Sequence, residues 1–271
     1  MAFERKFLGN AMKTCWLVAG PNGAGKSTLA KQYLPPECVE YVNFDEIASR
    51  LSREGTTENV MAQAGVIALR RIDQLIAEGR SFAIETTLSG RAHLRRIARM
   101  KNDGWRVELH YVFIPSRKFS ADRVQKRVEN GGHGVAEADI NRRYERSLGN
   151  VKEYSQLCDY TACYDNSPKR PHFVSIQFGN GNPMVFDQEV YNMIFHGDES
   201  GNPRGIAAES KAALDAFASS VRGEFEAYAE KDADVVVADD KRNPVVKPAR
   251  VVLEELRQED EGKGDDKTSL N

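Results

Sequence analysis

Short apolar runs alternate along this chain of 271 residues with longer segments in which apolar residues recur every three or four positions. Runs that are rich in β-branched and aromatic residues, with little polar alternation, are typical of strands covered on both faces. Such runs predict strands at Cys15–Gly20, Val39–Phe44, Ser81–Thr86, Arg106–Ile114 and Asp159–Ser167. Because helical patterns separate these strands, the sequence predicts an α/β fold with a doubly wound, mainly parallel five-stranded sheet.

The segments between the strands carry the spacing of amphipathic helices. The longest predicted helix is Glu58–Ala77, and Gly79 follows it as a helix-ending residue. Shorter helices are predicted at Arg91–Lys101, Ser116–Glu129, Glu137–Leu157 and Asp187–Phe195. After Pro171, the stretch "FVSIQF-GNGN-PMVF" places two β-rich runs around a Gly/Asn turn, which predicts a hairpin added to the fold.

Composition changes near both ends of the chain. We predict an N-terminal extension over 1–12, one main domain over 13–196, and a linker with an amphipathic helix over 197–230. Residues 231–271 are dense in charge, and their end, "RQEDEGKGDDKTSLN", is too polar to form a core. We therefore predict a disordered acidic tail there.

Overall composition excludes several classes of function. Apolar residues make up 41% of the chain, which is enough for a core, and the net charge of −2 gives no electrostatic reason to expect nucleic acid or an anionic membrane as partner. No apolar stretch approaches the ~18 residues of a spanning helix, and the N-terminus lacks the apolar region of a signal peptide. The four cysteines are scattered, which favours free thiols in the cytoplasm.

One motif points directly to chemistry. Gly20-x-x-x-x-Gly25-Lys26-Ser27 follows a predicted strand and opens a predicted helix, which is the context of a phosphate-binding P-loop. Its glycines let successive N–H groups face one anion, Lys26 would reach the β- and γ-phosphates, and Ser27 would ligate Mg²⁺. ATP and Mg²⁺ are thus the predicted cofactors, and the residues predicted to bind them are Gly20, Pro21, Asn22, Gly23, Ala24, Gly25, Lys26, Ser27 and Thr28.

Two carboxylates follow neighbouring strands at the same predicted edge of the sheet, where ligands bind in such folds. Asp45 could accept the proton of an alcohol that attacks the γ-phosphate, or it could simply cap the helix Glu46–Arg53. Glu85 could hold Mg²⁺ or orient the acceptor, or it could be a solvated residue at the end of a strand. Thr87 supplies a neutral donor beside it.

Arginines surround the glycine-rich stretch "GGHG" at 131–134, which resembles the hinge of a lid. Guanidinium groups could lie over the transferred phosphate, but interleaved acidic residues indicate that some of them form surface ion pairs. Arg127 is our first candidate for a catalytic cation, and Arg143 and His133 are candidates for binding substrate. The arginines concerned are Arg123, Arg127, Arg142, Arg143 and Arg146.

Together, five segments in order resemble the zeta-toxin family, and more closely its bacterial branch described as predicted ABC-type ATPases. They are "LVAGPNGAGKSTLA", "VNFDEIA", "IETTLSG", "RVENGGHGV" followed by "INRRYERSL", and "CYDNS". The resemblance implies a kinase that phosphorylates UDP-N-acetylglucosamine, with Asp45 as base, Glu85 as the strand-end carboxylate and Arg127 as a lid arginine. Two positions depart from the family. His133 stands about where the family has a second lid arginine, and the helix before Ser81, in which the family has a sugar-binding glutamate, has no acid here until Asp73.

The sequence therefore predicts an Mg²⁺–ATP-dependent kinase acting on a small hydroxylated acceptor, such as a nucleotide sugar, in which an antitoxin protein would be a partner. A polynucleotide 5′-kinase would share the P-loop and the base, although the near-neutral charge argues against it. A non-catalytic nucleotide-binding switch is the alternative from another class of protein.

Overall fold

The computed structural model describes residues 12–35, 38–55, 59–130, 134–167, 172–197, 230, 234–238 and 244–262. The chain divides into two compact units. One unit is Lys13–Pro203, and the other combines Met1–Met12 with Arg204–Asn271. The predicted extension up to residue 11 and the predicted amphipathic helix Glu209–Tyr228 lie outside the described residues.

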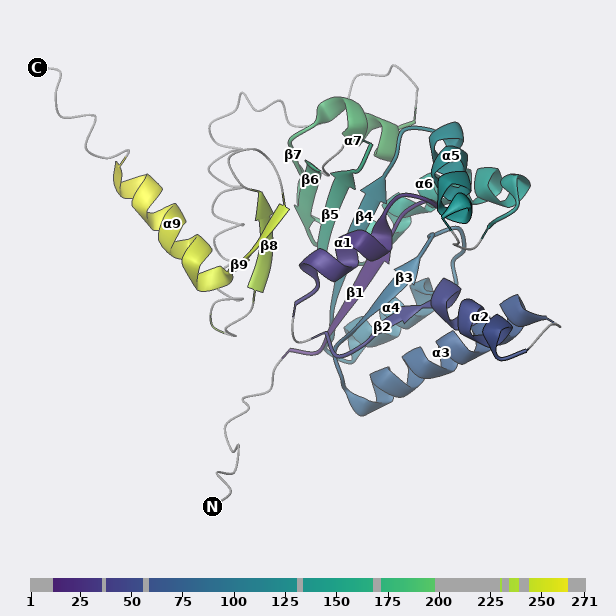
Figure 1. Ribbon diagram of the computed structural model, residues 1–271. Coiled ribbons are helices and arrows are strands. Elements are labelled where there is room, and N and C mark those ends of the chain that lie inside the picture. The colour runs from purple at the N-terminus through teal and green to yellow at the C-terminus, as the bar shows by residue number, and fades with distance from the viewer. Residues whose placement is uncertain are drawn as a thin grey trace, which may run out of the picture. The chain divides into compact units, whose positions relative to one another are not determined.

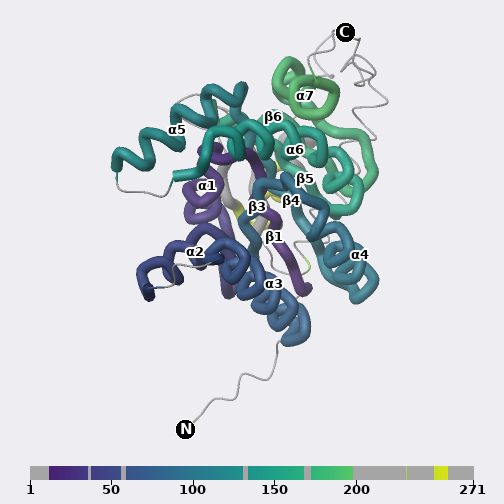
Figure 2. Tube along the Cα trace, turned by 90° about the vertical axis from the view of Figure 1, so that its right-hand side faces the viewer, coloured from purple at the N-terminus to yellow at the C-terminus, as the bar shows by residue number. Residues whose placement is uncertain are grey.

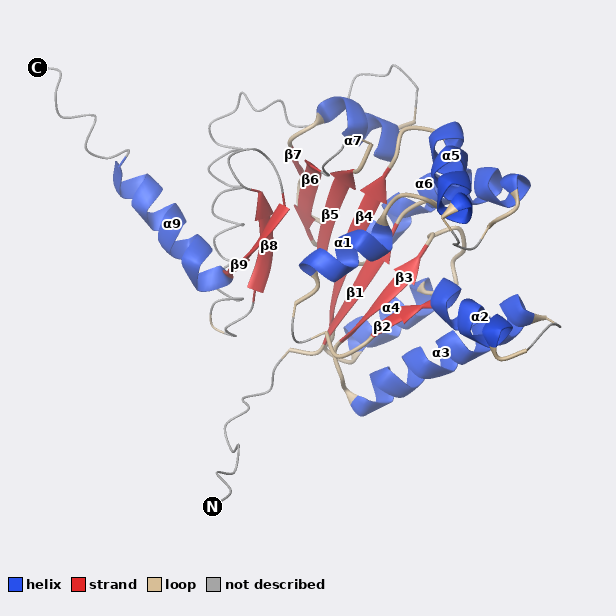
Figure 3. Ribbon diagram, viewed as in Figure 1, coloured by secondary structure: helices blue, strands red, loops and turns tan. Residues whose placement is uncertain are grey.

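A single twisted sheet forms the centre of the larger unit (Figures 1 and 3). Its first five strands are parallel, as the strand–helix alternation predicted, and their spatial order is β2-β3-β1-β4-β5. Two antiparallel strands, β6 and β7, then extend the sheet beyond β5. The bounds are β1 Thr14–Ala19, β2 Tyr41–Asn43, β3 Phe82–Thr86, β4 Arg106–Phe113, β5 Tyr160–Asp165, β6 His172–Phe178 and β7 Met184–Val185.

The hairpin predicted after Pro171 is confirmed, but it does not stand apart from the sheet. β6 pairs with β5 from Tyr160 opposite Phe178 to Asp165 opposite His172, so the described sheet has seven strands rather than five. The physical reason is that the edge of β5 would otherwise expose unpaired backbone groups, which β6 satisfies.

Helices connect the parallel strands in the predicted order. The bounds are α1 Lys26–Tyr33, α2 Phe44–Arg53, α3 Val60–Glu78, α4 Leu94–Asn102, α5 Arg117–Glu129, α6 Glu137–Ser155 and α7 Gln188–Phe195. Figure 2 shows α2 lying along α3 and α5 lying near α6, and both pairs are in contact. Because α2 starts directly after β2, its first turn lies at the carboxyl end of the parallel strands, the edge where such folds bind ligands.

The main core lies between one face of the sheet and the helices that cover it. Alternate strand residues such as Leu17 and Leu109 point into it, and Ile72, Ile97 and Val151 meet them from α3, α4 and α6. Each of these side chains is buried. This packing fixes the strands whose carboxyl ends carry the candidate site residues.

The opposite face of β4 and β5 carries a buried polar network. Arg106 Nε donates to Glu108 Oε1 at 2.7 Å, His110 Nε2 lies 3.4 Å from Glu108 Oε2, and His110 Nδ1 lies 2.9 Å from the Tyr164 hydroxyl. Burial pushes the pKa of Glu108 upward, but the hydrogen bond from His110 and the charge of Arg106 outweigh it and hold the pKa at about 2. Glu108 is therefore ionised in the folded protein at neutral pH.

We expect Glu108→Gln to destabilise the protein at pH 7 by about 3–5 kcal/mol, because a buried ion pair loses one partner. The folded pKa lies below the usual value of 4.5, so the carboxylate contributes stability above pH 4.5 and loses it as pH falls toward 2. The difference in melting temperature between parent and variant should thus shrink across that range. Melting curves at pH 7, 5, 4 and 3 check this, and a constant difference would contradict it.

The smaller unit contains the hairpin of β8 (Asp234–Ala238) and β9 (Pro244–Pro248), followed by α9 (Ala249–Gly262). This differs from the disordered tail predicted over 231–271. The runs "DVVVA" and "PVVKP" are rich in β-branched residues, which favour strands locally even within a highly charged segment. Residues 263–271 lie outside the described part of the chain.

Among the described helices, none combines the length and apolar character that crossing a bilayer requires.

Candidate active site

The P-loop between β1 and α1 has a backbone that only glycine allows at two positions. Gly20 has φ +140°, and a Cβ placed there would lie 2.2 Å from the carbonyl oxygen of Val112. Gly25 has φ +92°, and its Cβ would lie 2.3 Å from Nδ2 of Asn166. The glycines of the motif therefore allow both chain reversal and close packing against β4 and the residue that follows β5.

Side chains from later in the chain hold this loop in place. Ser120 Oγ donates to the Asn22 carbonyl at 2.6 Å, and Asn166 Nδ2 donates to the Ala24 carbonyl at 2.7 Å. Arg123 donates to the Asn166 carbonyl at 2.8 Å and stacks on Phe119. Arg123 thus positions the loop, and its role differs from that of a cation placed over the phosphate. Such bracing pre-organises the loop before a nucleotide arrives.

Lys26 is buried at the start of α1. Its Nζ donates to the Pro21 carbonyl at 3.0 Å and lies 3.8 Å from Glu85 Oε1. Burial lowers the pKa of this ammonium, and nearby Arg127 and Arg143 lower it further, while Glu85 and Asp45 oppose the shift. Arg127 and Arg143 therefore lie close enough to Lys26 for their charges to act on it.

Glu85, at the end of β3, is the centre of a hydrogen-bond cluster. Its Oε2 accepts from Ser27 Oγ at 2.7 Å, from Asn43 Nδ2 at 2.8 Å and from the Tyr41 hydroxyl. Parallel pairing places Asn43 directly beside Glu85. Burial raises the pKa of Tyr41, and the Glu85 charge raises it further, so Tyr41 stays a donor. Glu85 is therefore a partly buried, structured carboxylate rather than a solvated strand end.

Sequence reasoning missed Tyr41 and Asn43. The available signal was their spacing: positions 41 and 43 share one face of β2 and approach the same strand-end carboxylate. The position of Asn43 also contradicts the interpretation that Asp45 caps α2. The side chain of Asn43 caps α2 by accepting from the backbone N–H groups of Asp45 at 2.9 Å and Glu46 at 3.3 Å. Asp45 is consequently not the helix cap.

The carboxylate of Asp45 therefore has no structural task that the described residues reveal. No hydrogen bond or ion pair within the described part of the chain engages its oxygens, whereas Glu85 Oε2 accepts three donors. Asp45 is half-buried in the first turn of α2 and faces a pocket. An unengaged carboxylate in such a position can accept a proton from a bound hydroxyl.

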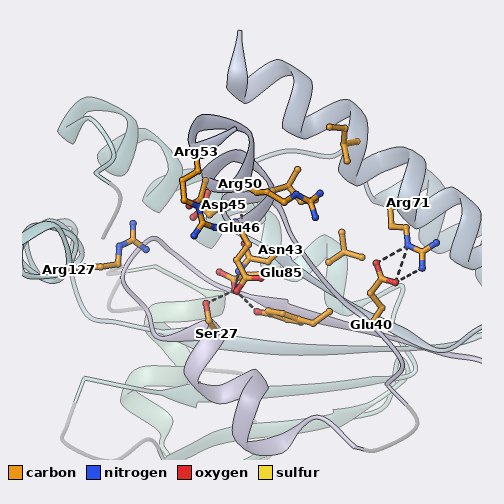
Figure 4. Close-up of a pocket in the computed structure, with 15 residues that line it drawn as sticks. Ser27, Glu40, Asn43, Asp45, Glu46, Arg50, Arg53, Arg71, Glu85 and Arg127 are labelled. Atoms are coloured by element: carbon orange, nitrogen blue, oxygen red, sulfur yellow. Dashed lines mark hydrogen bonds and ion pairs between the residues drawn. The ribbon is translucent and has the colours of Figure 1, made fainter. Parts of the chain in front are cut away.

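One pocket of about 810 Å³ collects many of the predicted residues (Figure 4). Ser27, Asp45, Glu85 and Arg127 line it, although they come from four separate elements. Figure 4 shows Arg127 reaching in from one side and Arg71 lying at the other, where Arg71 forms a forked pair with Glu40. Other charged residues of the lining that the sequence did not single out are Glu40, Glu46, Arg50, Arg53 and Arg71.

The remaining predicted residues are placed as follows. Arg143 lies half-buried on α6, close enough to influence Lys26, and Thr87 bonds to Ser89 at 2.8 Å in the loop after β3. Neither contributes to the lining of the large pocket. Arg142 pairs with Asp139 on the surface, which matches the expectation that some arginines form ion pairs. His133 lies outside the described residues.

The residues around Ser27 fit a magnesium ion that is bound together with phosphates. Ser27 Oγ gives its proton to Glu85, which leaves lone pairs of the hydroxyl free to face a cation. Within the described residues, no group of three or more His, Cys, Asp and Glu side chains could hold a metal. Mg²⁺ commonly keeps several waters and takes only one or two protein ligands beside substrate phosphates, so this sparse set suits it.

Comparisons with known proteins agree with this fold. A family profile described as "AAA domain" matches residues 15–146. An uncharacterized protein of Haemophilus influenzae is 30% identical over 125 residues, which cover 46% of this chain and 88% of that protein. The solved structure of AvrRxo1-ORF1:-ORF2 with ATP contains a chain with a TM-score of 0.57 and 18% identity, over 71% of this chain and 66% of that chain. A chain of the same complex with sulphate ions also has a TM-score of 0.57 and 18% identity. That match covers 90% of this chain and 76% of the other.

Fold and site together define a P-loop protein that shares its fold with a chain of the AvrRxo1-ORF1:-ORF2 complex, as the resemblance seen in the motifs led us to expect. Because the match spans most of the Haemophilus protein, the chain belongs to the same family as that protein. The chain spans about two thirds (66%) of the length of the AvrRxo1 chain in the ATP complex.

Proposed function

We propose that this protein is a kinase that transfers the γ-phosphate of ATP to a hydroxyl group of a small acceptor. The observation that carries the proposal is the single pocket in which P-loop Ser27, Asp45, Glu85 and Arg127 meet. A site that only binds nucleotide has no need of an 810 Å³ pocket next to the P-loop with an unengaged carboxylate on its wall.

Each side chain then has a distinct task. Lys26 stabilises charge on the β- and γ-phosphates, and Arg127 and Arg143 approach the same region from α5 and α6. Asp45 accepts the proton of the attacking hydroxyl. Glu85 orients the Ser27 hydroxyl toward a bound Mg²⁺, which would neutralise phosphate charge.

The acceptor itself would be anionic, and a nucleotide sugar such as UDP-N-acetylglucosamine fits this class. Arg50 and Arg53, one turn apart on α2, line the pocket, and their guanidinium groups make no ion pair or hydrogen bond with the other described residues. Figure 4 shows both on the helix that also carries Asp45. Two such guanidinium groups beside the base favour a phosphorylated acceptor.

The decisive experiment incubates the protein with γ-labelled ATP and separate acceptors: nucleotide sugars, their unphosphorylated sugars, small polyols and 5′-hydroxyl oligonucleotides. We expect label on a nucleotide sugar. Label on the oligonucleotide would instead identify a polynucleotide kinase. If no acceptor is labelled while ATP still binds, a nucleotide-binding switch becomes the better interpretation.

The double substitution Arg50→Gln and Arg53→Gln should raise KM for a phosphorylated acceptor by roughly 10–100-fold. This is the loss of affinity expected when one hydrogen bond to a charged group is removed. KM for ATP should change little, because neither arginine belongs to the P-loop. Arg70→Gln, on the exposed surface of α3 and outside the pocket, is the matched control. Steady-state kinetics check this, and an unchanged acceptor KM would show that these arginines do not hold the phosphates.

A second protein would restrain the kinase, as an antitoxin does. The support is that the AvrRxo1 structures of similar fold are complexes of two proteins, ORF1 and ORF2. Expression of this chain alone and of its Asp45→Asn variant in a bacterial host tests the idea. Arrested growth with the parent only would indicate a toxic kinase that needs such a partner, and equal growth would count against it.

A further inference from the structure

A second cavity, of about 160 Å³, lies alongside the large pocket. Val42 and Glu85 line both, so the two share a wall at the end of β2 and β3. The other walls are mainly apolar side chains of β3, α2 and α3, with Gly65 of α3 on one side. The smaller cavity is thus an apolar annex next to the catalytic groups.

His93 brings the second polar group to this cavity. It stands directly before α4, and its Nδ1 atom is buried without a hydrogen-bond partner among the described residues. Burial, helped by the charge of Arg96, lowers the pKa of His93 to about 4, so the imidazole is neutral at physiological pH. Buried polar atoms are nearly always paired, so an unpaired one in a residue that lines a cavity points to a missing partner.

Size and polarity restrict what this partner can be. An apolar protein cavity of about 150 Å³ holds a molecule of the size of benzene. A charged group would lose part of its hydration against these mainly apolar walls, and Glu85 Oε2 already accepts three hydrogen bonds, so Glu85 offers little compensation. The occupant is therefore uncharged and largely apolar, with one hydrogen-bonding atom for His93.

We propose that this cavity receives an uncharged, mainly apolar branch of the acceptor, which His93 recognises through one hydrogen bond, so that the cavity selects among acceptors. The role in selection rests on the proposed kinase function, whereas the binding capacity of the cavity does not. One experiment therefore tests whether the cavity binds a ligand, and a second tests whether it selects the acceptor.

The first experiment uses phenol and benzene as probes and follows the methyl signals of Leu69 and Ile72 by NMR. Millimolar phenol should shift both signals in the parent. Gly65→Leu should abolish binding, because the new side chain fills the cavity; a Cβ at this position meets only Phe44, at an ordinary 3.5 Å. Gly149→Leu is the control, since Gly149 is an exposed position of α6 with nothing within 4 Å of a Cβ built there.

Binding that persists in Gly65→Leu, or no binding to the parent, would overturn the cavity as a ligand site. For the hydrogen bond, the parent should prefer phenol to benzene by about threefold to tenfold. His93→Leu should lose this preference while still binding benzene. If His93→Leu still prefers phenol to benzene, His93 does not recognise the ligand through a hydrogen bond.

The second experiment uses whichever acceptor the labelled-ATP assay identifies. His93→Leu and Gly65→Leu should raise KM for that acceptor roughly tenfold, with KM for ATP and kcat nearly unchanged. Normal acceptor KM in both variants would overturn the selective role. If no acceptor is labelled at all, the proposed kinase function fails, and the phenol result still decides whether the cavity binds a ligand.

Discussion

Lys26→Ala should abolish most of the phosphoryl transfer and most of the ATP affinity while leaving the protein folded. Lys26 is a buried cation aimed from the start of α1 at the loop that would hold the phosphates, 3.0 Å from the Pro21 carbonyl. Removing one pre-organised charge stabiliser costs about 10²–10³-fold in rate at such sites. ATP binding by calorimetry and transfer from labelled ATP measure the two losses.

The folded state should tolerate this change for two reasons. Burial disfavours the charged ammonium, as the lowered pKa of Lys26 indicates, so its removal relieves a desolvation cost. Glu85 also keeps its three other donors. Lys31→Ala, an exposed lysine in the last turn of the same helix, is the control and should behave as the parent. Transfer by Lys26→Ala at the parental rate would refute the assignment of the P-loop.

Asp45→Asn should give a folded, ATP-binding protein whose turnover falls by about 10²–10⁴-fold, the usual cost of losing a general base. The structure sharpens this test, because Asn43 and not Asp45 caps α2. Stability should therefore change little, and a loss of activity cannot be attributed to a frayed helix. Single-turnover transfer and a melting curve measure both effects.

Glu46→Gln is the matched control for Asp45→Asn. Glu46 follows Asp45 in the same first turn of α2, lines the same pocket and carries the same charge. If activity depends only on the local negative charge, both variants should lose it equally. If Asp45 is the base, Glu46→Gln should keep turnover within a few-fold of the parent. If both variants lose only a little turnover, Asp45 is not the base, and another group of the pocket would have to accept the proton.

The sequence by itself determined the order of elements and the position of the P-loop. Local patterns were sufficient because strand and helix periodicity, together with glycine at positions of positive φ such as 20 and 25, depend on neighbouring residues. The same patterns placed Asp45 and Glu85 at one edge of a parallel sheet, since the carboxyl ends of such strands always meet. The local patterns did not predict β8 and β9, because the high charge of residues 231–271 led us to expect disorder despite their short β-rich runs.

Only the tertiary structure decided what each side chain of the candidate site contacts. The register of β2 against β3 sets Asn43 beside Glu85, and thereby occupies Glu85 and leaves Asp45 unengaged. The tertiary structure also separates the arginines. Arg123 donates to a backbone carbonyl near the P-loop, whereas Arg127 lines the pocket. Sequence spacing could not separate them, because hydrogen bonds and burial depend on contacts between segments that are more than forty residues apart.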